Sequence, residues 1–112
     1  MNIESESLDG GILKITLSGR MDIQGTQEID LKFTGHTANQ SAVIVDMSAV
    51  DFLSSIGIRT LLLSAKAVSK RNGKMVLLNP DESVTHILEM AGIDTLIPIH
   101  RSLEEARKAV TS

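Results

Sequence analysis

The sequence predicts one α/β domain, residues 1–112, in which about four helices cover a mixed sheet of about five strands. Three observations favour this fold class. The turn signal Asp9-Gly10-Gly11 joins two short alternating segments into a β-hairpin at the start of the chain. After it, short apolar runs alternate with segments whose apolar residues recur at helical spacing. Finally, a chain of 112 residues with 42% apolar content is long enough to bury one hydrophobic core. Strands that alternate with helices in this way pack the helices against a sheet.

The hairpin and a short helix are the first elements. Residues 3–8 and 12–17 are its two strands, and the second alternates between two sets of side chains that face opposite sides of a sheet. A helix is expected over about 26–34, and Gly35 is a stop signal for it.

The middle of the chain contains the clearest strand and the clearest helix. Residues 42–47, Ala-Val-Ile-Val-Asp-Met, form a near-continuous apolar run, as expected for a strand buried on both faces. Helical spacing of apolar residues follows over about 55–71 and ends at Asn72-Gly73. Residues 74–78 are another short apolar strand.

The last third predicts a helix, an edge strand and a final helix. Pro80 opens the first helix and Gly92 ends it. The strand at 96–99 contains a proline, which cannot donate to a ladder and therefore favours an edge position. The closing helix covers 102–110, with a serine as its N-cap. The expected order is β-β-α-β-α-β-α-β-α.

Composition argues against several functional classes. The net charge of −3 and the absence of Trp and Tyr are unlike a nucleic-acid binder. The chain has no cysteine, which excludes disulfides and thiolate metal sites. No signal peptide and no apolar run of about 20 residues is seen, so neither export nor direct membrane insertion is expected. The cytoplasm is the expected location.

No catalytic constellation is apparent. His36, His86 and His100 are scattered without metal-ligand spacing, and each is expected to be a surface residue. Neither a nucleotide-binding glycine pattern nor a Gly-x-Ser-x-Gly elbow is present. We therefore expect no enzymatic activity, no metal and no cofactor.

Two adjacent serines mark the start of the main predicted helix. Ser54 and Ser55 follow a buried strand, where the first backbone N–H groups of a helix lack acceptors and the helix dipole is positive. A phosphate on either hydroxyl could accept hydrogen bonds from those N–H groups. Physics alone favours a simpler interpretation, in which a serine caps the helix and contributes about 1 kcal/mol.

The same segment resembles the signature of the STAS family of anti-sigma-factor antagonists. That signature has an aspartate, a phosphorylatable serine, a second hydroxyl residue and a glycine, and here Ser54, Ser55, Ile56 and Gly57 occupy those places. Ser54 thus replaces the aspartate and Ile56 the second hydroxyl residue. Further similar segments, covering nearly the whole chain together, lie at residues 17–22, 72–76 and 84–93.

The resemblance implies a STAS-like fold and a protein-binding switch. A member of this family binds an anti-sigma factor with a histidine-kinase-like ATPase fold, which phosphorylates the serine and releases it. A PP2C-type phosphatase restores binding. Ser55 takes the acceptor role by position, Ser54 is the second choice, and Asp22 matches a family residue near the site. Some members instead act without a phosphate cycle, as scaffold subunits of signalling or membrane-transport complexes.

The outward side of the main helix predicts a docking surface. At 100° per residue, Ile56, Arg59, Leu63, Lys66 and Lys70 point away from the apolar side, and residues 53–79 contain five basic and no acidic side chains. We expect an apolar centre rimmed by cations, to which an acidic partner binds through these residues together with Asp22 and Gly57. The alternative is a solvated basic face with one exposed leucine.

Two other functional classes remain as alternatives. A small-nucleotide binder or enzyme ranks last because no cluster of catalytic groups appears. A phosphorelay receiver domain needs clustered acidic residues at strand ends, and an opening hairpin does not fit it.

Overall fold

The opening hairpin forms as the sequence predicts. In the computed structural model, which describes residues 1–111, β1 (Asn2–Leu8) pairs antiparallel with β2 (Ile12–Met21). Gly10 and Gly11 make the turn with φ of 86° and 75°, a left-handed conformation that glycine adopts without steric cost.

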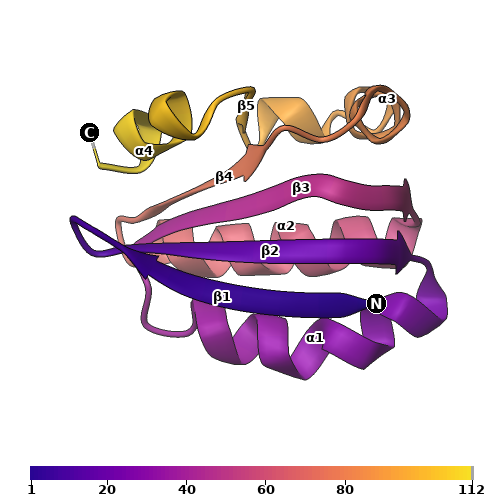
Figure 1. Cartoon of the computed structure of the whole chain (residues 1–112), viewed down its shortest axis with the longest axis horizontal. Coiled ribbons are helices and arrows are strands. Elements are labelled where there is room, and N and C mark those ends of the chain that lie inside the picture. The colour runs from indigo at the N-terminus through magenta and orange to yellow at the C-terminus, as the bar shows by residue number, and fades with distance from the viewer. Residues whose placement is uncertain (112) are drawn as a thin grey trace.

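The sheet has five strands in the order β1-β2-β3-β4-β5, and β2 to β5 run parallel (Figure 1). The remaining strands are β3 (Ala42–Leu53), β4 (Lys74–Leu78) and β5 (Ile99–His100). The helices of the described chain are α1 (Ile23–Thr37), α2 (Ser55–Lys70), α3 (Glu82–Met90), the short 3-10 helix η1 (Ile93–Thr95) and α4 (Leu103–Thr111). None of these helices combines the length and the apolar character that a membrane crossing requires. The mixed five-stranded sheet with four α-helices confirms the predicted fold class.

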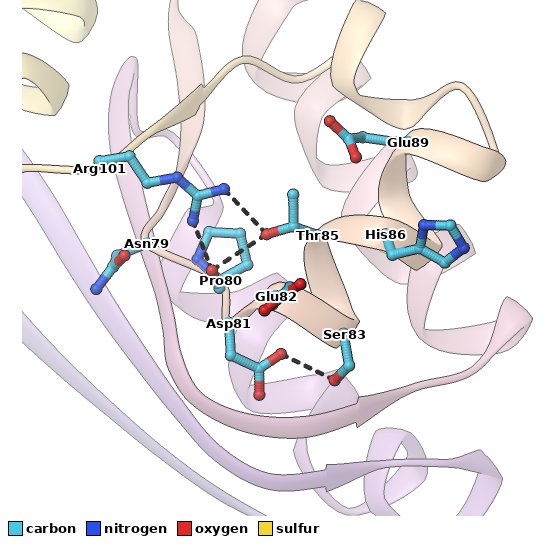
Figure 2. Close-up of a pocket in the computed structure, with 9 residues that line it drawn as sticks. All are labelled: Asn79, Pro80, Asp81, Glu82, Ser83, Thr85, His86, Glu89 and Arg101. Carbon is cyan, nitrogen blue, oxygen red and sulfur yellow. Dashed lines mark hydrogen bonds between the residues drawn. The ribbon is translucent and has the colours of Figure 1, made fainter.

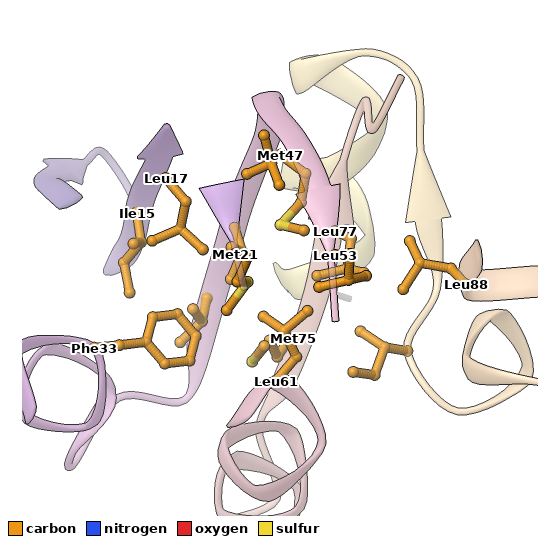
Figure 3. Packing of buried hydrophobic residues seen from close by; sticks show 14 of the residues in the cluster. Ile15, Leu17, Met21, Phe33, Met47, Leu53, Leu61, Met75, Leu77 and Leu88 are labelled. Carbon is orange, nitrogen blue, oxygen red and sulfur yellow. The ribbon is translucent and has the colours of Figure 1, made fainter. Parts of the chain in front are cut away.

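The larger core lies between one face of the sheet and α1, α2 and α3. Phe33 of α1, Leu61 of α2 and Leu88 of α3 are fully buried there against side chains of the central strands (Figure 3). On the other face α4 packs through Ala106 and Val110, which belong to a second, smaller cluster. As a result α1 and α2 lie side by side on the same face of the sheet.

α1 is longer at both ends than the predicted segment 26–34. It begins at Ile23 because the side chain of Asp22 caps it. It continues past Gly35 because a glycine inside a helix costs only about 1 kcal/mol. That cost is outweighed by burial of Phe33 and Thr37 on the inner side of the same helix.

The last strand is shorter than the predicted 96–99. Residues after Gly92 form η1, so that Leu96 and Pro98 lie outside the strand. The carbonyl of Pro98 still accepts a hydrogen bond of 2.9 Å from the N–H of Leu77. β5 pairs with β4 alone, at the edge of the sheet, as the proline predicted.

The end of α2 is tied to the end of α1 by Arg71. Its Nη2 donates to the carbonyls of Thr37 and Gln40, at 2.8 Å each. We expect Arg71→Ala to lower the free energy of unfolding by about 1–2 kcal/mol, because two carbonyls lose a charged donor. Urea denaturation measures this, with Lys70→Ala as the neighbouring control. Equal stability of the two variants would contradict the structural role of the Arg71 contacts.

Candidate functional site

The carboxyl ends of the four parallel strands each lead into a helix that is capped by a side chain. The four capping bonds run from Gly25 N to Asp22 Oδ1 (2.7 Å), from Gly57 N to Ser54 Oγ (3.3 Å), from Val84 N to Asp81 Oδ1 (2.8 Å) and from Glu105 N to Ser102 Oγ (3.2 Å). Each bond satisfies one of the N–H groups that a helix start leaves without an acceptor. Because the strands are parallel, all four helix N-termini lie at the same edge of the sheet.

The N-terminus of α2 differs in charge from the other three. α1 and α3 are capped by aspartates, and α4 has two glutamates in its first turn. Among the helices of residues 1–111, α2 alone has neither an acidic cap nor an acidic residue in its first turn. No carboxylate of its own cap or first turn therefore compensates the positive end of its dipole.

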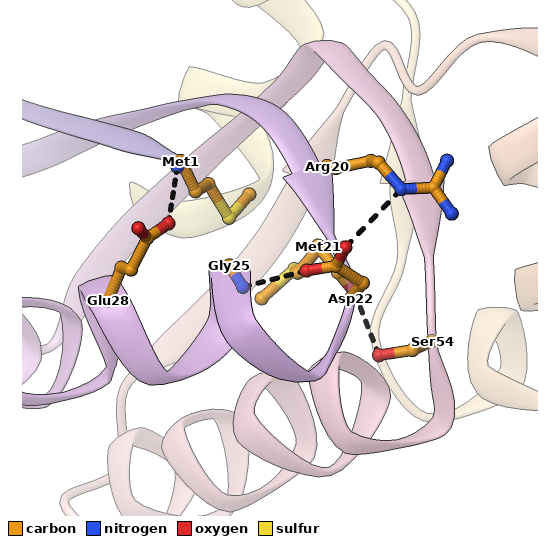
Figure 4. A network of polar contacts seen from close by, with 7 residues as sticks. All are labelled: Met1, Arg20, Met21, Asp22, Gly25, Glu28 and Ser54. Atoms are coloured by element: carbon orange, nitrogen blue, oxygen red, sulfur yellow. Dashed lines mark hydrogen bonds and ion pairs between the residues drawn. The ribbon is translucent and has the colours of Figure 1, made fainter.

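The two serines at this helix start have different environments. Ser54 is half-buried, and its Oγ donates to the carbonyl of Met21 at 2.7 Å while accepting from Gly57 (Figure 4). Ser55 is the first residue of α2 and is exposed. A second protein can thus reach the hydroxyl of Ser55, whereas the hydroxyl of Ser54 holds the end of β3 to the end of β2.

Asp22 lies next to this contact, at the end of β2. Its carboxylate accepts from Gly25 N and pairs with Arg20 Nε at 3.3 Å (Figure 4). The N–H of Gly25 holds the pKa of Asp22 below its ordinary value, and Arg20 lowers that pKa further. The guanidinium of Arg20 also stacks over Phe52, 4.2 Å from the ring centroid. Phe52 lies 32 residues from Arg20 along the chain, so no local pattern indicates this contact.

Gly57 is buried, unlike the other predicted partner-binding residues of α2. A Cβ at this position would lie 2.8 Å from Met21 Cγ and 3.0 Å from Leu53 Cδ1. The glycine therefore allows α2 to start close against the ends of β2 and β3. Its contribution to the site is to position Ser55, since its own atoms offer little surface to a partner.

The outward side of α2 carries the residues that the helical spacing placed there. Arg59, Leu63, Lys66 and Lys70 are exposed and Ile56 is half-buried. In the described part of the chain the three cations form no ion pair with another residue.

The cation rim predicted around Leu63 stays a prediction. Leu63 lines a groove between α2 and α1, together with Asp30 and Thr34 of α1 and with Arg71, whereas Arg59, Lys66 and Lys70 are not among the lining residues. On the side of the groove, α1 is therefore the neighbour of Leu63. A helical wheel of α2 alone could not show this neighbour.

A cavity of about 820 Å³ lies at the start of α3 (Figure 2), and neither Ser54 nor Ser55 is among its lining residues. Its lining includes Asp81, His86, Glu89 and Arg101. Arg101 donates to the carbonyl of Pro80 at 2.6 Å and to Thr85 Oγ1 at 3.1 Å, so that it ties the start of α4 to α3. Across residues 1–111, no group of three or more histidine and acidic side chains is arranged to hold a metal.

The sequence of this chain matches the model of the STAS domain over residues 5–106. It is 26% identical over 110 residues to BtrV of Bordetella bronchiseptica, a protein assigned as an anti-sigma factor antagonist, and the match covers 97% of this chain and 94% of BtrV.

Solved structures share the fold. An anti-sigma factor antagonist from Mycobacterium paratuberculosis superimposes with a TM-score of 0.88 at 23% identity, over 99% of this chain and 94% of the other. The unphosphorylated form of the antagonist SpoIIAA gives a TM-score of 0.77 at 20% identity, over 96% of this chain and 95% of that one. The phosphorylated form of SpoIIAA from Bacillus gives a TM-score of 0.71 at 19% identity, and the match covers 96% of this chain and 98% of that one. The family model spans most of the chain, and the strands and helices superimpose on those of the solved antagonists. This chain therefore belongs to the STAS family and has the fold of anti-sigma factor antagonists.

Proposed function

We propose that this protein is an anti-sigma-factor antagonist that binds a partner of histidine-kinase-like ATPase fold and is released when Ser55 is phosphorylated. One observation carries the proposal. An exposed serine begins the helix that has no acidic residue as its cap or in its first turn, and the outward side of that helix bears three exposed cations. The antagonist relatives, one of which has a solved phosphorylated form, support the same assignment.

The proposed modification is a phosphoryl transfer from ATP. The oxygen of Ser55 bonds to the γ-phosphorus, the bond from that phosphorus to the β,γ-bridging oxygen breaks, and ADP leaves while the hydroxyl proton passes to a base of the kinase. The product carries about two negative charges at pH 7. The first N–H groups of α2 and its dipole stabilise them.

Release follows from charge and desolvation. Docking of an acidic partner on Arg59, Lys66 and Lys70 depends on opposite charge across the interface. A phosphate at Ser55 reverses the local charge at one end of that surface and must itself be desolvated on binding. The complex therefore dissociates without a large conformational change. A PP2C-type phosphatase then restores the hydroxyl, and we place the cycle in the cytoplasm.

Ser54 is the second choice for the acceptor, and the structure gives a physical reason for this order. Phosphorylation of Ser54 would remove the hydroxyl proton that it donates to Met21. It would also place a charged group in a half-buried position between two strand ends. Ser55 has neither cost.

Mass spectrometry of the protein from its native cells tests the acceptor. We expect one phosphate in the wild type and in Ser54→Ala, and none in Ser55→Ala. Phosphate that persists in Ser55→Ala and disappears in Ser54→Ala would move the acceptor to Ser54. Absence of phosphate under all growth conditions would contradict the cycle and favour a scaffold subunit.

A further inference from the structure

The outward side of α1 carries no charged residue. Leu31 is two residues from both Ile29 and Phe33, which are buried, so it points to the opposite side of the helix from the core, about 180° away. Its exposed fraction of 89% is the highest among the exposed large apolar residues of the described chain. Around the helix from Asp30 through Leu31 to Glu28, the exposed residues between these two carboxylates are Ile23, Gln24, Gln27, Leu31, Thr34 and Gly35. A solvated helix normally carries charges opposite its core side.

The charged side chains of α1 lie on its flanks instead: Asp30 on one, and Glu28 and the exposed Lys32 on the other. Asp30 lines the groove toward α2 and accepts from Thr60 Oγ1 at 3.4 Å. Glu28 is bound at 2.7 Å by the amino group of Met1, which comes from the β1 side (Figure 4). Both carboxylates are therefore engaged within the domain. The outward strip between them remains uncharged.

This strip adjoins the outward side of α2 across a groove whose lining includes the charged residues Asp30 and Arg71. The two helices run next to each other on one face of the sheet (Figure 1), and the groove between them has a volume of about 340 Å³. Ile23 on α1 and Leu63 on α2 are also exposed, at 62% and 56%. We call the α1–α2 face the surface formed by Ile23, Gln27, Leu31 and Thr34 of α1 with Ile56 and Leu63 of α2.

We propose that the α1–α2 face docks one partner protein, through an apolar strip of that partner that is bordered on one side by acidic residues. Specific interfaces have cores depleted of charge and polar rims, which fits an uncharged strip with cations on one border. Arg59, Lys66 and Lys70 form that border, and α2 contains no acidic residue that would offset them. Naming the partner as the histidine-kinase-like protein rests on the function proposed above.

A second copy of this chain fits the face less well. Its own α2 would bring the same three cations and no acidic row to meet them, and like charges across an interface are unfavourable.

The size of the face indicates where the rest of the contact lies. Helices of 15 and 16 residues make a face about 23 Å long and two helices wide, or about 450 Å². A standard interface buries about 800 Å² on each partner, so this face supplies about half. The remainder includes the adjoining N-terminus of α2 with Ser55, because α1 and α2 start at the same edge of the sheet.

Site-specific photo-crosslinking in the native cells tests this placement. A benzophenone side chain is introduced at Leu31, at Lys66 and, as a control, at Leu96, which is also exposed but follows α3. We expect Leu31 and Lys66 to capture the same protein, identified by mass spectrometry as one with a histidine-kinase-like fold, and Leu96 not to capture it.

The affinity of the purified captured protein for variants of this chain then measures how much the α1–α2 face contributes to binding. We expect Leu31→Glu to weaken binding roughly tenfold or more, as a charge in the interface centre does. Met90→Glu, the same change at a residue that is 76% exposed on α3, should leave binding within about twofold. Both residues are exposed, so both variants are expected to fold, which circular dichroism checks.

The outcomes separate this inference from the proposed function. If Lys66 captures the histidine-kinase-like protein and Leu31 does not, the inference fails and the proposed function stands. If both positions capture one protein of another class, the shared docking face stands and the proposed function fails. Crosslinks from Leu31 to a second copy of the chain would overturn the proposed occupant.

Discussion

Gly25→Ala is expected to lower the free energy of unfolding by roughly 2–4 kcal/mol, one of the largest effects of a single methyl group in this protein. A Cβ at Gly25 would collide with the backbone carbonyl oxygen of Arg20 and come within 3.1 Å of Asp22 Oδ1. Because a backbone atom cannot rotate away, the start of α1 would have to move from the end of β2. That movement would also weaken the cap by which Asp22 holds the helix.

Gly35 provides a matched control in the same helix. A Cβ there meets no atom within 4 Å, and the residue is exposed. Gly35→Ala should therefore raise the free energy of unfolding by about 0.5–1 kcal/mol through helix propensity. Urea denaturation of both variants measures the contrast. If Gly25→Ala is as stable as the wild type, α1 does not begin as close to β2 as described.

Charge reversal on α2 should produce the largest loss of partner binding. In the double variant Lys66→Glu/Lys70→Glu, we expect affinity for the partner captured by crosslinking to fall by about tenfold or more at low salt, since attraction becomes repulsion. The loss should shrink in salt, because the Debye length falls from about 10 Å at 0.1 M to about 3 Å at 1 M. Titration of the purified partner at several salt concentrations measures both effects.

Lys108→Glu controls for where the charge is reversed, and it changes the net charge by −2, half the change in the double variant. Lys108 is exposed on α4, which covers the opposite face of the sheet, and it lies 3.5 Å from Glu104. This variant should bind the partner as the wild type does. If the double variant also binds normally at low salt, the outward side of α2 is not the docking surface.

Local patterns were sufficient to predict the order of the elements. The Asp9-Gly10-Gly11 turn predicted the hairpin, and apolar spacing predicted the long helix that begins at Ser55. Both patterns depend on residues within a few positions of each other, so they can be recognised without knowledge of the tertiary structure. The predicted ends of the elements were less accurate where tertiary packing outweighs the helix propensity of a residue. The continuation of α1 past Gly35 is an example.

The neighbours of the site could not be predicted in this way. The hydroxyl of Ser54 bonds to Met21, 33 residues away, and Arg71 bonds to Thr37, 34 residues away. Such pairs depend on which strands and helices become adjacent, and no periodic pattern encodes that. The uncharged side of α1 was present in the sequence as Gln24, Gln27 and Leu31 at helical spacing.

The sequence by itself determined the fold class, the family resemblance and the position of a serine at the start of the longest helix. Only the tertiary structure decided that α1 lies beside α2, that Leu63 lines the groove between them, and that Ser54 is engaged while Ser55 is exposed. The physical reason is that helix and strand formation follow local periodicity. The composition of a surface follows from how distant segments pack.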